Sequence, residues 1–207
     1  MTDAVAGSHD RAARLWLATQ QEIAQRAAHD LKNALNGVAV NLEVVRGRLA
    51  RPDATADGVV RYATTASAEF ERVTAYAEAL LALTRPPRTP VDVAAELRAL
   101  RTLLAAGVAA AGGAGRMSGA SGAAARLALA AALLAACKAG APTYELDTRA
   151  GGEVVVRVAC DAPPDGFDAE VADVAREAGI GVDLEPDVIT LTFPPAREGD
   201  RSAIRSA

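Results

Sequence analysis

Two series of apolar residues at heptad spacing constrain the first half of this chain more than any other feature. In the first series, steps of three and four residues alternate through Ala28, Leu31, Leu35, Val38, Leu42, Val45 and Leu49. In the second, the same steps join Val59, Ala63, Ala66, Phe70, Val73, Ala77 and Leu80. This spacing places each series along one face of a long helix.

The two predicted helices are joined by a short segment, which indicates an antiparallel hairpin. Arg51 and Pro52 end the first helix, and either Ser8 or Asp10 is expected to cap its start. The predicted loop between the two helices is short, residues 52–58. One hairpin cannot cover both of its apolar seams, so we expect two hairpins to pair into a four-helix bundle, which makes the protein a homodimer.

A proline-rich segment divides the chain into two parts. Three prolines stand within five residues in the sequence TRPPRTP, residues 84–90, and proline cannot continue a helix. We therefore assign residues 8–84 to the helical hairpin, 85–90 to a linker and 91–195 to a second domain. Residues 196–207 form a polar tail that we expect to be flexible.

The second domain alternates between helical and strand patterns. Strands are expected at 91–93, 143–148, 153–159 and 188–193; helices at 94–111, 123–139 and 167–178; and a glycine-rich loop at 112–122. This order predicts an α+β domain with helices on one face of a small sheet. With 51% hydrophobic but only 3% aromatic residues, the chain does not fit an aromatic-rich β-sandwich.

Charge and hydropathy exclude several classes of function. A net charge of −4 provides no basic surface for a nucleic-acid backbone, so no nucleic-acid partner is expected. The longest apolar run, residues 127–137, is too short to span a bilayer. The first residues also lack the basic-then-apolar order of a signal peptide. We therefore expect a cytoplasmic protein without a membrane partner.

One polar cluster in the first helix can carry chemistry. His29, Lys32, Asn33 and Asn36 stand at positions i, i+3, i+4 and i+7, which lie on one helix face, and Asp30 follows the histidine. The heptad assignment places all five outside the seam, in solvent. An exposed imidazole beside a carboxylate can accept a phosphoryl group, because neutral imidazole is nucleophilic near pH 7. On spacing alone, an ordinary solvated histidine with unrelated polar neighbours is the favoured interpretation.

The sequence AHDLKNALNGVAVNLEVV resembles the phosphoacceptor box of histidine kinases. The box has a histidine, an acid, an aliphatic residue, Arg or Lys, Asn or Thr, Pro and Leu. The chain matches it at His29, Asp30, Leu31, Lys32, Asn33 and Leu35, with Ala34 in place of the proline. The resemblance implies that His29 is the phosphoacceptor and Asp30 its acid/base partner. It also implies that Asn33 orients water or the phosphoryl group. Lys32 and Asn36 are candidate binding residues, Lys32 for phosphate or an acidic partner.

The second domain resembles a degenerate form of the ATP-binding, Bergerat-like domain of the same kinases. The helix at 123–138 stands where such kinases carry magnesium-holding asparagines, and it contains no Asn. Asp161 matches the adenine-reading aspartate, but Ala162, Pro163 and Pro164 replace the glycines that follow it. Asp161 fits equally well as a turn residue. The resemblance therefore predicts no ATP binding and no cofactor of the chain's own, with magnesium supplied by a receiver partner.

Three functions are compatible with these features. The chain most resembles ChpT-type histidine phosphotransferases, which relay phosphoryl groups between the aspartates of response-regulator receiver domains. That resemblance implies receiver domains as partners, and a hybrid histidine kinase is a further candidate. The alternative is a non-enzymatic pseudokinase scaffold that binds receivers or a partner kinase. A divergent active kinase is disfavoured by the missing asparagines and glycines.

Overall fold

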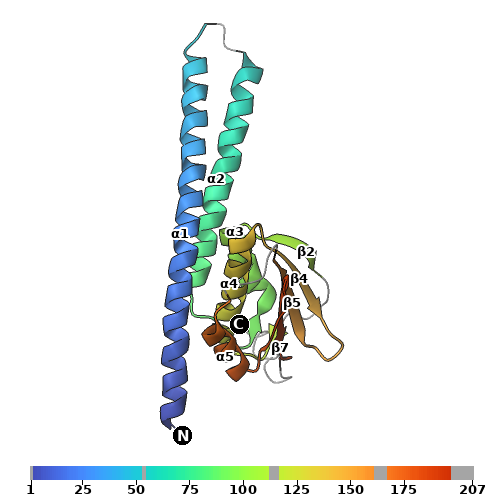
Figure 1. Ribbon diagram of the computed structural model, residues 1–207. Coiled ribbons are helices and arrows are strands. Elements are labelled where there is room, and N and C mark those ends of the chain that lie inside the picture. Colours follow the sequence, from blue (N-terminus) through green and yellow to red (C-terminus); the bar gives the residue numbers. More distant parts are fainter. Residues whose placement is uncertain (1, 53–54, 112–116, 161–166, 197–207) are drawn as a thin grey trace, which may run out of the picture.

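The computed structural model describes residues 2–52, 55–111, 117–160 and 167–196, and Figure 1 shows their arrangement. A long helical hairpin comes first, and a small α/β domain packs beside its lower half. Residues 112–116 of the predicted glycine-rich loop, the segment from Asp161 to Gly166 and nearly all of the predicted tail lie outside the described residues. The predicted fold class, a helical hairpin followed by a small α/β sandwich, is confirmed.

The hairpin consists of α1 (Thr2–Leu49) and α2 (Ala56–Thr84), which run antiparallel side by side. At 48 residues, α1 is about 70 Å long, and its first part extends past the end of α2. The helix starts at Thr2, so the predicted cap at Ser8 or Asp10 is wrong. Thr55 caps α2, because its hydroxyl oxygen accepts a hydrogen bond from the Gly58 amide.

The seam between α1 and α2 runs one residue earlier on α1 than the sequence predicts. Ala27 and Ala34 are buried, and the Asp30 carboxylate contacts α2, whereas Leu35 and Leu42 are 48% and 51% exposed. Gly37 lies so close to Glu69 of α2 that an added methyl group would touch its side chain. Small side chains at this seam allow the helices to approach closely, and this leaves half of the predicted apolar series on the surface.

The α/β domain contains a mixed five-stranded sheet. Its elements are β1 (Val91–Asp92), α3 (Val93–Leu104), β2 (Gly107–Ala111), β3 (Met117–Ser118), α4 (Gly122–Ala139), β4 (Thr143–Thr148), β5 (Val154–Ala159), α5 (Ala169–Glu177), β6 (Gly181–Leu184) and β7 (Val188–Phe193). The strand order is β2-β4-β5-β7-β6, with β2 parallel to β4 and the other neighbours antiparallel. The short strands β1 and β3 form a separate antiparallel pair.

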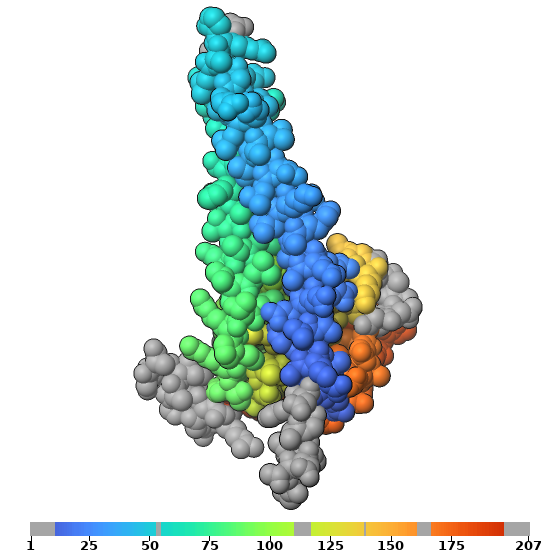
Figure 2. Space-filling view, turned by 90° about the vertical axis from the view of Figure 1, so that its left-hand side faces the viewer, coloured from blue at the N-terminus to red at the C-terminus, as the bar shows by residue number. Residues whose placement is uncertain are grey.

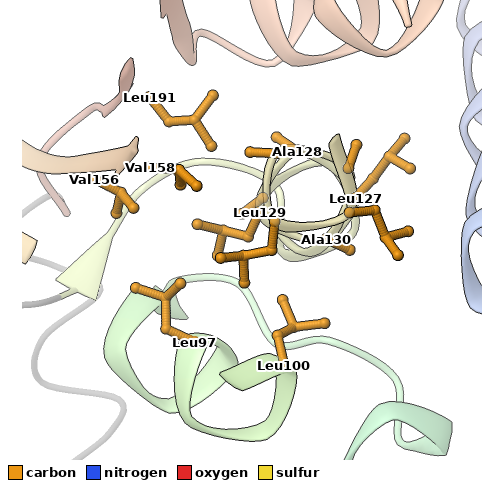
Figure 3. Packing of buried hydrophobic residues seen from close by; sticks show 14 of the residues in the cluster. Leu97, Leu100, Leu127, Ala128, Leu129, Ala130, Val156, Val158 and Leu191 are labelled. Atoms are coloured by element: carbon orange, nitrogen blue, oxygen red, sulfur yellow. The ribbon is translucent and has the colours of Figure 1, made fainter. Parts of the chain in front are cut away.

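Helix α4 lies at the centre of the core. In Figure 3, Leu97 and Leu100 of α3 lie on one side of it, and Val156, Val158 and Leu191 of the sheet lie on another. The hairpin helix α1 also contacts α4, so the layers run from hairpin to helices to sheet. A helix that is apolar on all sides is stable only when it is surrounded, and residues 124–136 of α4 are all buried.

The structure corrects two assignments in this domain. The predicted helix 94–111 ends at Leu104, because Ala105 takes a left-handed conformation with φ 51°. The alanine-rich residues that follow form strand β2, whose backbone groups pair with β4. Parallel pairing thus overrides the helix propensity of alanine. The edge strand β6 was also not predicted.

The two-residue strand β3, which lies inside the predicted glycine-rich loop, was not predicted either. The other predicted helix and strand boundaries of the α/β domain agree with the structure to within two residues, and β4 and β7 match it at both ends. Helix α2 begins at Ala56, three residues before the predicted start of the second helix at Val59. Among the helices of the described ranges, none combines the length and the apolar character needed to cross a bilayer.

Candidate functional site

His29 lies on the outer surface of α1, near the level where the α/β domain begins. Its side chain is 75% exposed, so the imidazole can be reached by a partner protein. Lys32, Asn33 and Asn36 are exposed on the same helix, as the sequence predicts. No hydrogen bond or ion pair among the described residues joins Lys32 or Asn36 to the imidazole.

The Nδ1 atom of His29 contacts two of the predicted site residues. It lies 3.3 Å from Asp30 Oδ1 and 3.3 Å from Asn33 Nδ2. These contacts need different tautomers, because Nδ1 donates to the carboxylate only when it carries a proton and accepts from the amide only when it does not. The structure therefore brings His29, Asp30 and Asn33 together at one ring nitrogen, and neither contact involves Nε2.

Asp30 was predicted to face solvent, and this prediction is wrong. Its side chain is only 36% exposed and lies at the edge of the seam with α2. The phenol of Tyr76, a buried residue of α2, donates a hydrogen bond to Asp30 Oδ2 over 3.3 Å. The guanidinium of Arg72 lies 6.0 Å from the centre of the Tyr76 ring. One carboxylate oxygen is thus directed to His29 and the other to α2.

Sequence reasoning missed Tyr76, although a signal was available. A tyrosine in the apolar interior of a helix pair needs a partner for its hydroxyl group. Tyr76 stands three residues after Val73 of the predicted series, so it lies on the same helix face. Had Asp30 been assigned to the seam, these two residues would have been an obvious pair.

A pocket of about 400 Å³ opens beside His29. One wall is formed by α1, through Gln25, Arg26, His29 and Asp30. The other is formed by the end of α3, through Leu103 and Leu104. The site therefore includes the junction between the hairpin and the α/β domain. Arg26, one of the lining residues, carries a guanidinium group, which is the kind of group that binds anions.

A thiol lies behind this pocket. Cys137 of α4 donates a weak hydrogen bond to the Leu104 carbonyl oxygen over 3.6 Å. Burial raises the pKa of the Cys137 thiol, and the nearby Arg26 opposes this shift in part. The sulfur is therefore held mainly in its neutral form, in which it is a poor nucleophile.

No side chain of α4 supplies an oxygen ligand for a magnesium ion. Arg126 and Lys138 are the polar side chains of this helix, whose sequence is GAAARLALAAALLAACKA, and neither supplies an oxygen ligand. The middle of the helix is packed on all sides by protein. Asp161, the candidate adenine-binding residue, lies outside the described residues. Across the described ranges, no group of three or more His, Cys, Asp or Glu side chains could hold a metal ion.

No protein-family model and no curated protein sequence matches the chain. Solved structures with a similar arrangement include one described as a bacterial phosphotransferase, which is 16% identical with a TM-score of 0.39. The match covers 85% of this chain and 95% of that one. The histidine kinase domain of the Erythrobacter litoralis EL346 blue-light activated histidine kinase is 13% identical with a TM-score of 0.35, and the match covers 89% and 94% of the two chains.

The longer structure of the same E. litoralis kinase is 12% identical, with a TM-score of 0.34. The match covers 86% of this chain and 61% of the kinase. The similarity to all three structures is one of overall arrangement.

Proposed function

We propose that the protein is a histidine phosphotransferase that relays a phosphoryl group between receiver-domain aspartates through His29, in a two-component phosphorelay. The observation that carries this proposal is the contact of the exposed imidazole, through Nδ1, with a carboxylate that is itself bound from the neighbouring helix. An ordinary surface histidine does not need a buried tyrosine to hold its carboxylate partner.

The proposed transfer follows from the geometry at the imidazole. When Nδ1 carries the proton and donates a hydrogen bond to Asp30, the lone pair is on Nε2 of the exposed ring. Nε2 attacks the phosphorus of a receiver's aspartyl phosphate, an N–P bond forms, and the P–O bond to the receiver aspartate breaks. The receiver carboxylate leaves with the bonding electrons. Asp30 stabilises the positive charge that develops on the ring or accepts the Nδ1 proton. Transfer to the second receiver is the reverse of these steps.

We propose that the phosphoryl group does not come from ATP. This is supported by α4, which has apolar packing in place of oxygen ligands. Phosphoryl transfer from a nucleotide needs magnesium and phosphate-binding groups held together. In this proposal, the receiver supplies the acidic residues and the magnesium that they bind, and the α/β domain contributes a wall of the docking site beside His29.

We further propose that two hairpins pair into a four-helix bundle. An apolar stripe runs along the exposed flank of α1, with Leu35, Leu42 and Leu49 at intervals of seven residues and 48–64% exposed. On α2, Phe70 and Leu81 are each 60% exposed. On both helices, each of these exposed residues comes one residue after a position that faces the partner helix. Because α1 and α2 run antiparallel, this places the exposed residues of both helices on the same face of the hairpin.

The stripe lies on the hairpin face turned away from the α/β domain. Arg26 lines the same pocket as Leu103 and Leu104 at the end of α3, so it lies on the side of α1 that faces the domain. Leu35 is nine residues further along α1, which is two and a half turns and therefore the opposite side of the helix. Figure 2 shows this face, where α1 and α2 lie side by side without any cover from the domain. Two copies related by a twofold axis would bury both stripes at once.

The function can be tested with the purified protein and two sources of labelled phosphoryl group. One reaction contains ATP and magnesium, and the other contains receiver domains already phosphorylated on aspartate. We expect acid-labile label on the protein in the receiver reaction alone. The label should be absent from His29→Ala and present on His9→Ala, a matched control because the chain has only two histidines.

Other outcomes would contradict the proposal in different ways. Label acquired from ATP would indicate a kinase and would mean that the α/β domain binds nucleotide. Receivers that bind without transferring label would favour the pseudokinase scaffold. Label on His29→Ala would place the phosphoacceptor elsewhere in the chain.

A further inference from the structure

We propose that Tyr76 is a positioning residue for the phosphoacceptor: its hydroxyl group fixes the Asp30 carboxylate so that His29 holds its proton on Nδ1 and presents the lone pair of Nε2. This inference rests on the proposed function, since it explains how the imidazole is kept in the reactive tautomer. It assigns to α2 a chemical role in addition to packing.

The first step is the position of Asp30. A carboxylate at the edge of an otherwise apolar seam is costly unless its oxygens are hydrogen-bonded. The neighbouring seam positions on α1, Ala27 and Ala34, are buried alanines. Tyr76 stabilises the carboxylate at this place, because its hydroxyl group donates to Oδ2 over 3.3 Å.

The second step is the rigidity of the donor. Only 3% of Tyr76 is exposed, so its ring is surrounded by protein and its hydroxyl group has a defined position. Arg72, one turn earlier on α2, lies over the ring, with its guanidinium carbon 6.0 Å from the ring centre. The hydroxyl group therefore holds Oδ2 in place, and this directs Oδ1 toward the imidazole.

The third step is the competition at Nδ1 of His29. Asp30 Oδ1 stabilises the tautomer with a proton on Nδ1, whereas the Asn33 amide stabilises the tautomer with the proton on Nε2. Only the tautomer with its proton on Nδ1 leaves the lone pair of Nε2 free to attack phosphorus. A carboxylate fixed by Tyr76 shifts this balance toward the reactive tautomer, while a freely rotating carboxylate would contribute less.

The test combines Tyr76→Phe with two measurements. The first is the share of the Nδ1–H tautomer of His29, measured from the ¹⁵N shifts of the ring nitrogens in unphosphorylated protein. The second is the rate of phosphoryl transfer from a phosphorylated receiver, with receiver affinity measured separately. We expect a smaller Nδ1–H share and a transfer rate about tenfold lower, the scale of one hydrogen bond to a charged group, with affinity unchanged.

A double-mutant cycle separates positioning from structure. In an Asp30→Ala background, Tyr76→Phe should have no further effect on the rate or on the tautomer, because the group it acts through is gone. Tyr62→Phe is the matched control, since the Tyr62 hydroxyl contacts Arg61 near the far end of the hairpin. It should leave both quantities unchanged.

Three results would overturn the inference. The first is an unchanged tautomer balance in Tyr76→Phe with a normal unfolding midpoint. The second is an equal effect of the substitution with and without Asp30. The third is a loss of receiver affinity that accounts for the whole loss of rate. The tautomer measurement needs no phosphoryl donor, so it still decides the role of Tyr76 if the wild-type protein accepts no label and the proposed function fails.

Discussion

Arg126 Nε donates a hydrogen bond to Glu96 Oε2 over 2.7 Å, and Nη2 donates to the other oxygen of the same carboxylate over 3.0 Å. Both side chains are nearly withdrawn from solvent. Nη1 also donates to the carbonyl oxygens of Leu83 and Arg85 at the end of α2. The guanidinium lies 5.7 Å from the centre of the Trp16 ring. One side chain of α4 thus contacts α1, α2 and α3 and joins the hairpin to the α/β domain.

Replacing Arg126 should be strongly destabilising. Arg126→Met leaves the Glu96 carboxylate buried without a partner, and breaking a buried ion pair in this way costs about 3–5 kcal/mol. Urea unfolding followed by circular dichroism measures the loss. The control is Arg149→Met, which removes a half-exposed pair with Glu153 and should cost less than about 1 kcal/mol. Equal losses in the two variants would contradict the proposed role of Arg126.

The apolar stripe on the hairpin predicts how dimerisation can be disrupted. Leu42→Glu should shift the protein toward monomer and weaken association by at least about tenfold, because it buries a charge in the proposed interface. Sedimentation equilibrium measures the association constant. Val40→Glu is the matched control, since Val40 is 63% exposed on α1 but does not belong to the stripe. A wild-type protein that is monomeric at all concentrations would rule out the bundle.

The hairpin could be predicted because heptad spacing depends on local sequence alone. The face of α1 that packs against α2 could not be predicted, because α1 carries two adjacent apolar stripes. Both Leu31 and Leu35 belong to the predicted series, but Leu31 is half-buried and Leu35 is exposed. The choice between the stripes is made by the small residues Ala34 and Gly37, which let α2 approach. Asp30 was predicted to lie in solvent because the wrong one of the two stripes was assigned to the seam.

The α/β domain shows a similar limit. Strands β4 and β7 alternate in polarity, which predicts them from the sequence. Strand β2 is rich in alanine and forms only because β4 provides a parallel partner 36 residues later, as in the pair Gly107 and Thr143. The resemblance to a phosphoacceptor box made His29, Asp30 and Asn33 candidate site residues. Tyr76 and the pocket wall from α3 come from elements that the box does not include.

Gly122 should tolerate no side chain. It begins α4 against the proline-rich segment, where its amide donates to the Thr89 hydroxyl over 3.0 Å. A methyl group here would overlap the backbone carbonyl of Arg88. We expect Gly122→Ala to lower the free energy of unfolding by roughly 1–3 kcal/mol, as overpacking does.

The matched control for this substitution is Gly47→Ala. Gly47 is also helical, and a methyl group there would meet nothing within 4 Å. It should raise stability by about 0.5–1 kcal/mol, because alanine favours the helix. Thermal or urea unfolding of both variants measures whether each substitution lowers or raises the free energy of unfolding. A stabilised Gly122→Ala would show that residues 85–90 do not pack against α4.

Asn33→Ala should move the His29 tautomer balance in the direction opposite to Tyr76→Phe. The Asn33 amide donates only to an unprotonated Nδ1, so its removal takes away the support for the tautomer with the proton on Nε2. The ¹⁵N shifts of the ring should therefore report a larger Nδ1–H share, and transfer into His29 should be as fast as in the wild type or faster. Asn36→Ala, on the same helix face one turn further along, is the control and should leave the balance unchanged. A smaller Nδ1–H share in Asn33→Ala would mean that the amide supports the reactive tautomer, and the competition proposed at Nδ1 would then be wrong.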